Sequence, residues 1–267
     1  MRGSEILMRI LGHLQAGGRL VLFLDYDGTL VPIARTPAEA QPDGELLGLL
    51  ADLARAPTFD PILLSGRPLA ALEAMLPVPG LTLAGTYGVE IRRGGRTIVR
   101  GADPAQVRHV VEQVKAEWEC LTWGRSGFLL EDKGLAIALH ARWAEPAEAD
   151  LVLEAARAVV MPLLLPHHFR ILTGDRFLEV APAAAHKGQA VDWVLDQIRN
   201  PNALPVYFGD DDKDEEAFAV VRRRGGIPIG VGERFPLRSA LGHLPSPEDV
   251  RVWLRRFLRG SEIDVQD

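Results

Sequence analysis

A continuous run of large apolar residues, from Leu20 to Leu24, ends directly before two acidic residues, Asp25 and Asp27. Such an uninterrupted apolar run is typical of a strand that is buried on both faces of a parallel sheet, between two layers of helices. Two carboxylates this close repel each other unless a cation lies between them or one of them binds a proton. The segment therefore predicts an α/β fold that holds a metal ion, a proton or both at the end of a buried strand.

The outer parts of the chain repeat this order of strand and helix. Residues 43–56 have helical periodicity with Asp43 as a plausible N-cap, and an apolar strand at 59–64 is followed by a polar turn and a helix at 69–76. Beyond position 185 the chain continues with a helix, an apolar strand, an acidic loop, a helix and a further short strand. Because the carboxyl ends of parallel strands meet at one edge of the sheet, we expect the functional residues in the loops at that edge.

The middle of the chain, residues 103–180, follows a different pattern. Two long helical segments, at 104–119 and 146–165, are each followed by a pair of short strands around a turn. The two turns are Asp132-Lys133-Gly134 and Thr173-Gly174-Asp175, which suit antiparallel hairpins. This order predicts a small antiparallel sheet backed by two helices. We therefore expect a Rossmann-like parallel-sheet core formed by residues 1–102 and 181–267, with an α+β unit inserted between its halves.

Charge and composition narrow the classes of partner. A formal net charge of −6 and a pI near 5.7 argue against a nucleic-acid surface, because binding to a phosphate backbone depends on clustered cations. The first twenty residues are apolar only at helical spacing, which predicts an amphipathic helix rather than a signal peptide, and no segment approaches the ~20 apolar residues of a membrane span. A single cysteine, Cys120, cannot form an internal disulfide, which fits a reducing cytoplasm. We expect a cytoplasmic monomer with a small-molecule partner and no nucleic acid or membrane.

Four groups of polar residues fall at the expected strand ends: Asp25-Tyr26-Asp27-Gly28-Thr29, Ser65, Lys187 and Gly209 to Asp214. In this order and position they resemble the four signature motifs of the haloacid dehalogenase superfamily, whose members are mostly Mg-dependent phosphatases. The first group fits the form DxDGT in full. The resemblance implies an enzyme of phosphoryl transfer with Mg²⁺ as its cofactor, and it implies that the inserted unit is a cap.

The superfamily resemblance also implies a role for each group. Asp25 would be the nucleophile that forms an aspartyl phosphate, a known covalent role for carboxylates. Asp27 would protonate the departing alkoxide and later deprotonate the attacking water. Ser65 and Lys187 would donate hydrogen bonds to the phosphoryl oxygens, and Lys187 would offset surplus negative charge.

A ligand set for Mg²⁺, a hard cation that prefers oxygen, follows from the same resemblance. Asp25, Asp210 and the backbone carbonyl of Asp27 would bind the ion. Asp214 would hold a metal-bound water or orient the lysine of the third motif. Asp211 could share that duty.

Segments across roughly Leu20 to Val231 resemble trehalose-6-phosphate phosphatases; they are LLEDKGLAIALHAR, RFLEVAPAAAHKG, SGR and GDDDKDEEAF. In that family a Glu and a Lys of the first hairpin and a Glu of the later strand bind sugar hydroxyls. The matching positions here are Glu131, Lys133 and Glu179. Carboxylates accept hydrogen bonds from hydroxyls and an ammonium donates to them, so these residue types suit a sugar. The alternative is an exposed hairpin whose Glu/Lys pair contributes little.

The SGR segment adds three residues to the expected substrate-binding set, Ser65, Gly66 and Arg67. One departure from the family concerns Tyr87 in GTYGVE, where the family commonly shows a histidine in a G-x-H-G segment. A tyrosine can still donate a hydrogen bond, but it is larger and does not charge near neutral pH. This departure leaves the identity of the sugar open.

The leading interpretation is a Mg-dependent phosphatase that hydrolyses trehalose 6-phosphate through an aspartyl phosphate. One alternative keeps the mechanism and changes the substrate to another glycosyl phosphate, such as glucosylglycerol phosphate or sucrose phosphate. A phosphomutase would in addition have to protect its phosphoenzyme from water. A further alternative is a catalytically silent sugar-phosphate sensor, and the presence of Asp25, Asp27, Lys187 and Asp210 argues against it.

Overall fold

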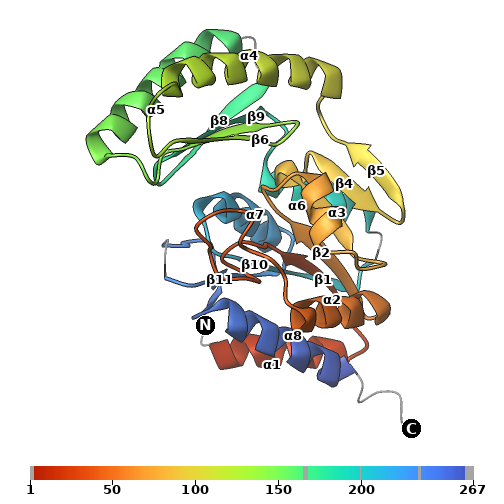
Figure 1. Cartoon of the computed structure of the whole chain (residues 1–267). Helices are drawn as coiled ribbons and strands as arrows, with labels where there is room; N and C mark the ends of the chain where they lie inside the picture. The colour runs from red at the N-terminus through yellow and green to blue at the C-terminus, as the bar shows by residue number, and fades with distance from the viewer. Residues whose placement is uncertain (1–2, 165–167, 199, 234–235, 262–267) are drawn as a thin grey trace. The chain divides into compact units, whose positions relative to one another are not determined.

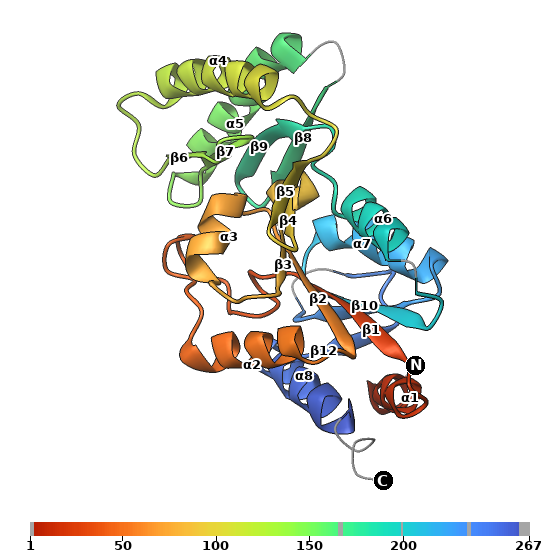
Figure 2. The same cartoon turned by 90° about the vertical axis from the view of Figure 1, so that its right-hand side faces the viewer.

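The computed structural model describes residues 3–164, 168–198, 200–233 and 236–261. These residues form two compact units (Figure 1, Figure 2). The core unit consists of the residues up to Thr97 and those from His186 onward, and the inserted unit runs from Ile98 to Ala185. None of the described helices combines the length and the apolar composition that a membrane span requires.

An eight-stranded sheet dominates the core unit, and its last strand leads the chain into the inserted unit. Its strands lie in the order β12 (Gly242–Leu244), β11 (Ile227–Val231), β10 (Ala203–Gly209), β1 (Arg19–Leu24), β2 (Phe59–Leu64), β3 (Thr82–Gly85), β4 (Glu90–Arg93) and β5 (Arg96–Val99). The strands from β12 to β3 are parallel, and β4 runs antiparallel to β3. This arrangement confirms the α/β fold class.

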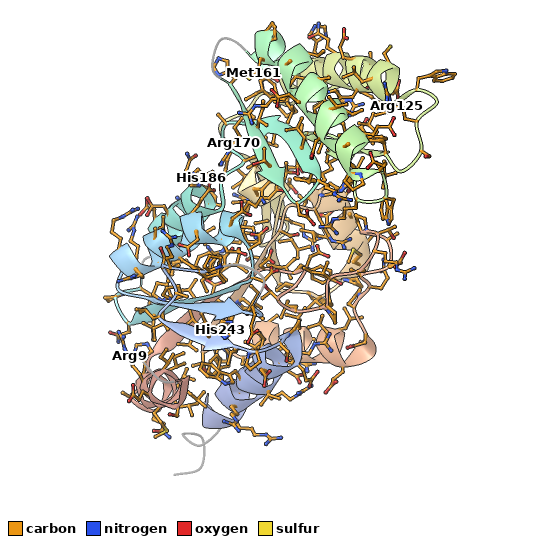
Figure 3. The ribbon with its side chains drawn as sticks, turned by 90° about the vertical axis from the view of Figure 1, so that its left-hand side faces the viewer. Arg9, Arg125, Met161, Arg170, His186 and His243 are labelled. Carbon is orange, nitrogen blue, oxygen red and sulfur yellow. The ribbon has the colours of Figure 1, made fainter. Side chains whose placement is uncertain are left out.

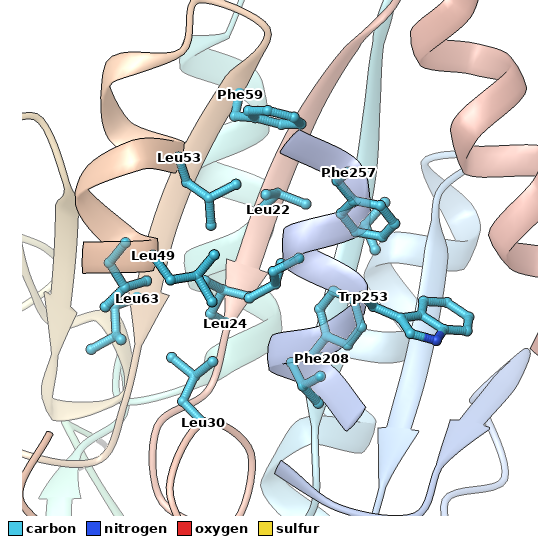
Figure 4. Close-up of a cluster of buried hydrophobic side chains, with 14 of the residues drawn as sticks. Leu22, Leu24, Leu30, Leu49, Leu53, Phe59, Leu63, Phe208, Trp253 and Phe257 are labelled. Carbon is cyan, nitrogen blue, oxygen red and sulfur yellow. The ribbon is translucent and has the colours of Figure 1, made fainter. Parts of the chain in front are cut away.

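Strand β1 is buried on both faces, as its continuous apolar sequence predicts. Leu22 and Leu24 contribute to one apolar layer, in which side chains of α2 and α8 surround them (Figure 4). Val21 and Phe23 contribute to the opposite layer. The first layer includes α1 (Gly3–Gln15), α2 (Gly44–Arg55), α3 (Leu69–Met75) and α8 (Pro247–Ser261), and the second includes α6 (Lys187–Gln197) and α7 (Asp212–Arg223). Each fully buried large apolar side chain stabilises this core by about 1.5–3 kcal/mol.

Strand register decides which loops meet at the carboxyl edge of the sheet. Leu24, the last residue of β1, pairs with Phe208 on β10 and with Leu63 on β2. The residues that follow these strands therefore emerge next to one another at the carboxyl edge of the sheet, where open parallel sheets bind their ligands. Asp25 follows β1 directly, and Asp210 follows β10 directly.

The inserted unit contains a four-stranded antiparallel sheet with two helices on one face (Figure 1). Its strands lie in the order β6 (Leu129–Asp132), β7 (Ile137–His140), β9 (Phe177–Pro182) and β8 (Phe169–Gly174), and its helices are α4 (Pro104–Thr122) and α5 (Pro146–Val160). Ile137, Leu139 and Val180 pack with Trp118 of α4 in one apolar cluster. The indole N–H of Trp118 donates to the carbonyl of Ala156 at 3.0 Å and so joins the two helices. The predicted α+β character of this unit is confirmed.

Candidate active site

The loop after β1 carries the DxDGT motif and turns around a single carbonyl group. The carbonyl oxygen of Tyr26 accepts hydrogen bonds from the backbone N–H groups of Thr29 and Val31 at 3.4 and 3.2 Å. This turn brings the Thr29 hydroxyl back toward Asp25, where Oγ1 donates to Oδ2 at 3.3 Å. The N–H of Asp25 itself donates to the carbonyl of Phe208 on β10 at 3.0 Å. The turn therefore fixes Asp25 at the end of the central strand.

Gly28 is required in this turn by its backbone angle and by its surroundings. Its φ of 85° lies in the left-handed region that L side chains rarely adopt. A Cβ atom at this position would lie 2.2 Å from a carboxylate oxygen of Asp210. A larger residue at position 28 would therefore displace Asp210 from its place near Asp25.

Lys187 joins two buried carboxylates. Its Nζ lies 2.8 Å from Oδ1 of Asp25 and 2.7 Å from Oδ1 of Asp214. Lys187 is the first residue of α6 and follows His186 (Figure 3), whose ring accepts the backbone N–H of Gln189 at 3.3 Å. A cation at a helix N-terminus is opposed by the helix dipole. The negative charges of Asp25 and Asp214 offset this unfavourable interaction of Lys187 with the helix dipole.

Asp214 forms hydrogen bonds with both of its oxygens inside the chain. Oδ1 accepts from Lys187 and from the hydroxyl of Tyr207, each at 2.7 Å. Oδ2 accepts from the backbone N–H groups of Asp210 and Asp211 at 3.0 and 3.1 Å. Asp211 is the N-cap of α7 and forms a capping box with Asp214. Of the two roles implied by the resemblance, this geometry suits the orientation of Lys187.

Three buried carboxylates form a candidate metal centre. Asp25, Asp210 and Asp214 each offer one oxygen, and these oxygens lie within 4.8 Å of one another. The Thr29 hydroxyl links two of them, because Oγ1 lies 3.3 Å from Asp25 Oδ2 and 3.5 Å from Asp210 Oδ1. Hard divalent cations prefer such oxygen donors, and a cation would relieve the repulsion between these like charges. The residues present therefore fit a metal ion.

Burial controls the protonation of these acids. Removal from water raises the pKa of Asp25 to about 8, against the lowering effect of Lys187. Burial and, after it, the negative charge of Asp214 raise the pKa of Asp210 to about 7. Burial alone lowers the pKa of Lys187, but Asp214 and Asp25 more than offset this effect and hold its pKa well above the ordinary value. Without a cation the cluster therefore retains protons near neutral pH, and a bound cation would displace them.

Asp27 pairs with a different cation from its neighbour in the motif. Nε and Nη2 of Arg67 donate to Oδ2 and Oδ1 of Asp27 at 2.7 and 2.8 Å. The carboxylate of Asp25, in contrast, contacts Lys187 and Thr29. The two acids at the end of the strand therefore have separate environments, which suits two separate chemical roles.

Ser65 begins the turn after β2 and lies among backbone contacts. Its N–H donates to the carbonyl of Ala84 at 2.9 Å, and its Oγ accepts the N–H of Arg67 at 3.2 Å. Tyr87, whose φ of 55° is unusual for a residue with a side chain, donates its N–H to the carbonyl of Ser65 at 2.9 Å. A Cβ atom on Gly66 would lie 2.6 Å from the Tyr87 ring. Tyr87 therefore lies directly against the SGR turn.

The predicted sugar-binding residues of the inserted unit lie together on its sheet. The register places Glu131, Ala138 and Glu179 in one row across β6, β7 and β9. Nζ of Lys133 lies 3.0 Å from Oε2 of Glu179 and 4.0 Å from Oε2 of Glu131. A further contact, which the sequence did not predict, joins Glu131 to Nε2 of His140 at 2.9 Å.

A comparison with known protein families gives a match to the model of the trehalose-phosphatase family over residues 23–235. The chain belongs to this family. It is therefore a phosphatase, and the acidic cluster at the end of β1 matches the metal dependence expected of haloacid dehalogenase phosphatases.

Individual members of the trehalose-phosphatase family cover most of the chain. A probable trehalose-phosphate phosphatase of Sinorhizobium fredii is 33% identical over 232 residues, which cover 86% of this chain and 84% of the relative. A trehalose-phosphate phosphatase of Mycobacterium tuberculosis is 34% identical over 89% of this chain, which spans 61% of that relative's length. The solved structure of the Aspergillus fumigatus trehalose-6-phosphate phosphatase is 25% identical, with a TM-score of 0.68 and coverage of 96% of this chain and 98% of that one. These similarities confirm the family that the motifs predicted.

Proposed function

We propose that this protein hydrolyses trehalose 6-phosphate to trehalose and phosphate, with Mg²⁺ as its cofactor and an aspartyl phosphate as its intermediate. The observation that carries the proposal is the buried ion pair of Lys187 with Asp25 at the end of β1, beside the carboxylate of Asp210. Phosphoryl transfer needs a placed nucleophile, a cation for the transferred group and oxygen ligands for a metal ion. The choice of trehalose 6-phosphate as the substrate follows from the relatives, which are trehalose-phosphate phosphatases.

In the first half-reaction a carboxylate oxygen of Asp25 attacks phosphorus and forms an O–P bond. The bond between phosphorus and the sugar oxygen breaks, and its electron pair stays on the sugar oxygen. The carboxyl group of Asp27 gives its proton to that oxygen, so trehalose leaves as a neutral alcohol and Asp27 becomes a carboxylate.

In the second half-reaction a water molecule attacks the phosphorus of the aspartyl phosphate. The carboxylate of Asp27 takes a proton from this water, and the bond between phosphorus and the oxygen of Asp25 breaks. Phosphate leaves, Asp25 returns to a carboxylate, and Asp27 returns to the acid that the next cycle requires.

The remaining residues of the motifs bind and orient. Lys187 and Ser65 donate to the phosphoryl oxygens, and Gly66 lets the SGR turn approach them. Asp25, Asp210 and the backbone carbonyl of Asp27 would hold Mg²⁺, which when bound supplies the positive charge that offsets the phosphate dianion. Asp214 orients Lys187 through the 2.7 Å contact between them.

The sugar is assigned to the inserted unit. Glu131 and Glu179 offer acceptors in one row across the sheet, and Lys133, in the turn after β6, offers a donor 3.0 Å from Glu179; this set suits the hydroxyls of a glucose ring. On this proposal residues 103–180 are the cap of the enzyme, and residues 1–102 and 181–267 form its catalytic core.

We further propose that the protein is a cytoplasmic monomer. Cys120 is a free, exposed cysteine, which suits a reducing cytoplasm. The motif residues assigned above all lie in the core unit, and three of their carboxylates cluster there, so a monomer would suffice as the catalytic unit.

Phosphate release from a panel of sugar phosphates, with Mg²⁺ and with a strong chelator, tests the proposal. We expect trehalose 6-phosphate to give the highest kcat/KM and the chelator to abolish turnover. A higher kcat/KM for glucosylglycerol phosphate or sucrose phosphate would change the substrate and keep the mechanism. No release from any sugar phosphate would contradict the proposal and favour a sensor.

A further inference from the structure

We propose that Arg67 is a positioning residue that acts through Asp27, and that it is not a ligand of the phosphoryl group. The inference rests on the proposed function, because it assigns Asp27 the transfer of protons to the leaving oxygen and from the attacking water. It replaces the role of substrate binding that the SGR motif suggests for Arg67.

The contact between the two side chains is a two-point fork. Nε and Nη2 of Arg67 donate to the two different oxygens of the Asp27 carboxylate at 2.7 and 2.8 Å. Two parallel charge-assisted hydrogen bonds fix the plane of a carboxylate as well as its position, which a single bond does not. The Arg67 side chain is only 10% exposed, whereas 39% of the Asp27 side chain is exposed. The buried Arg67 side chain therefore fixes the orientation of the more accessible Asp27 carboxylate.

Arg67 is itself held in place along its whole length. Its guanidinium lies 5.2 Å from the centroid of the Tyr26 ring, and Nη1 lies 3.4 Å from Sδ of Met75. Its backbone N–H donates to Oγ of Ser65, and its carbonyl accepts the N–H of Thr86 at 2.8 Å. The hydroxyl of Tyr26 in turn donates to a backbone carbonyl at 3.1 Å. A group fixed at both backbone and side chain is suited to orient another residue.

The same contacts argue against a role in phosphate binding. Each of the three guanidinium nitrogens already has a partner within the chain: Nε and Nη2 bond Asp27, and Nη1 contacts Met75. A phosphate that used the fork would break the pair with Asp27. The pairing leaves each oxygen of Asp27 with a second lone pair, which remains available for the proton of the leaving group or of water.

The role through Asp27 predicts a dependence on the leaving group. An alkoxide such as that of trehalose must be protonated as it departs, whereas p-nitrophenolate is stable without a proton. We expect Arg67→Met to lower kcat/KM for trehalose 6-phosphate by about 10²-fold or more, the usual contribution of general acid–base catalysis, and kcat/KM for p-nitrophenyl phosphate by less than about tenfold. The comparison uses kcat/KM because hydrolysis of the aspartyl phosphate is common to both substrates and enters kcat alone. KM should rise for neither substrate, because no substrate contact is removed.

A double-mutant cycle with Asp27→Asn tests whether Arg67 acts through Asp27. If Arg67 acts through Asp27, adding Arg67→Met to the Asp27→Asn variant should change kcat on trehalose 6-phosphate by less than about threefold, although each single change is large. If Arg67 binds the phosphoryl group, its removal should cost as much in the double variant as in the wild type.

The chain offers a control and a second variant. Arg93→Met removes another partly buried arginine of the core unit, one that bonds Asp60 at 2.6 Å, and it should leave the ratio of the two activities unchanged. If Arg67→Met does not fold, Arg67→Lys keeps the charge without the two-point fork and should still lower the activity ratio by about tenfold.

Equal losses on both substrates together with a raised KM, or additivity in the cycle, would overturn the inference. These outcomes differ from failure of the proposed function, which would appear as a wild-type enzyme that hydrolyses p-nitrophenyl phosphate but not trehalose 6-phosphate. In that case the same comparison is made between alkyl and aryl phosphates, and the same ratio decides it.

Discussion

The ammonium of Lys187 lies 2.8 Å from a carboxylate oxygen of Asp25, although 162 positions separate the two residues along the chain. The side chain of Lys187 is 3% exposed and that of Asp25 is 7% exposed. The same ammonium also contacts Asp214, so one cation lies between two buried acids. Removing one partner of such a group leaves an uncompensated buried charge, which is far more costly than the loss of a surface pair.

Lys187→Met should therefore destabilise the metal-free protein by about 3–5 kcal/mol and abolish phosphate release. Chemical denaturation followed by circular dichroism measures the first effect. Lys115→Met, which removes an exposed pair with Asp132, should cost less than about 1 kcal/mol and leave the activity intact. Equal stability of the two variants would contradict the importance assigned to the Lys187 pair.

Asp210→Asn should lower kcat by about 10²-fold or more, because a metal ion must offset the phosphate dianion beside Asp25. The variant should also require more Mg²⁺ for half-maximal activity. Asp212→Asn is a matched control, since Asp212 begins α7 two positions after Asp210, but its carboxylate is about half exposed and bonds only Lys213 among the contacts described. A wild-type response of the Asp210 variant to Mg²⁺ would contradict the metal site.

The stability of the metal-free protein should fall as the pH rises from about 4 to about 8. Burial raises the pKa of Asp25 from 3.8 to about 8 and that of Asp210 to about 7, so the folded state binds protons more tightly than the unfolded state across this range. Unfolding then releases protons, and ΔG of unfolding decreases with pH.

Bound Mg²⁺ should prevent this loss of stability at higher pH, because the cation replaces the protons on Asp25 and Asp210. The difference in Tm with and without Mg²⁺ should therefore grow with pH by roughly 5 °C or more between pH 5 and pH 8. Differential scanning fluorimetry across this range measures it. A difference in Tm that is constant with pH, or that shrinks, would show that the buried carboxylates do not bind the ion.

Alanine at Glu131, Lys133 or Glu179 should lower kcat/KM for trehalose 6-phosphate far more than for a small aryl phosphate. A site built to pair with hydroxyls leaves its own polar groups unpaired when one member is removed, typically at ~1–3 kcal/mol per lost partner. Glu117→Ala, an exposed change on α4 of the same unit, should affect neither substrate. If all three variants lose both activities equally, or neither, the hairpin is structural and the trehalose specificity has another origin.

Sequence patterns predicted the architecture where local signals and tertiary structure agree. The apolar run before Asp25 is a central strand, and Asp43 is the N-cap of α2, with its carboxylate 2.7 Å from the N–H of Leu46. Helix α5 is shorter than its pattern predicts: it ends at Val160 and continues as a 3₁₀ turn, because Pro162 has no N–H to extend it, and residue 165 of the predicted helix lies outside the described residues.

Some elements were not predicted. Strands β3, β4 and β5 are only four residues long, and β4 and β5 carry arginines, so their pairing depends on neighbouring strands more than on their own pattern. Helix α8 did have a usable signal, since Val250, Leu254 and Phe257 recur at helical spacing and are buried.

The motif residues could be predicted because a parallel sheet brings its strand ends together, but their partners could not. The fork between Arg67 and Asp27 and the bond from Tyr207 to Asp214 depend on side-chain directions in the folded loops. The sequence did contain one signal for the second contact. Tyr207 places a hydroxyl in an otherwise apolar strand, and a buried hydroxyl requires a hydrogen-bond partner.

The most direct test of the central claim is phosphate release from trehalose 6-phosphate by the Asp25→Asn variant in saturating Mg²⁺, beside the wild type and the Asp212→Asn control. The amide is nearly isosteric with the carboxylate but is not a competent nucleophile, so the variant should fold and release no phosphate above background, whereas the control should match the wild type. Release by Asp25→Asn at a rate near that of the wild type would contradict an aspartyl phosphate at Asp25.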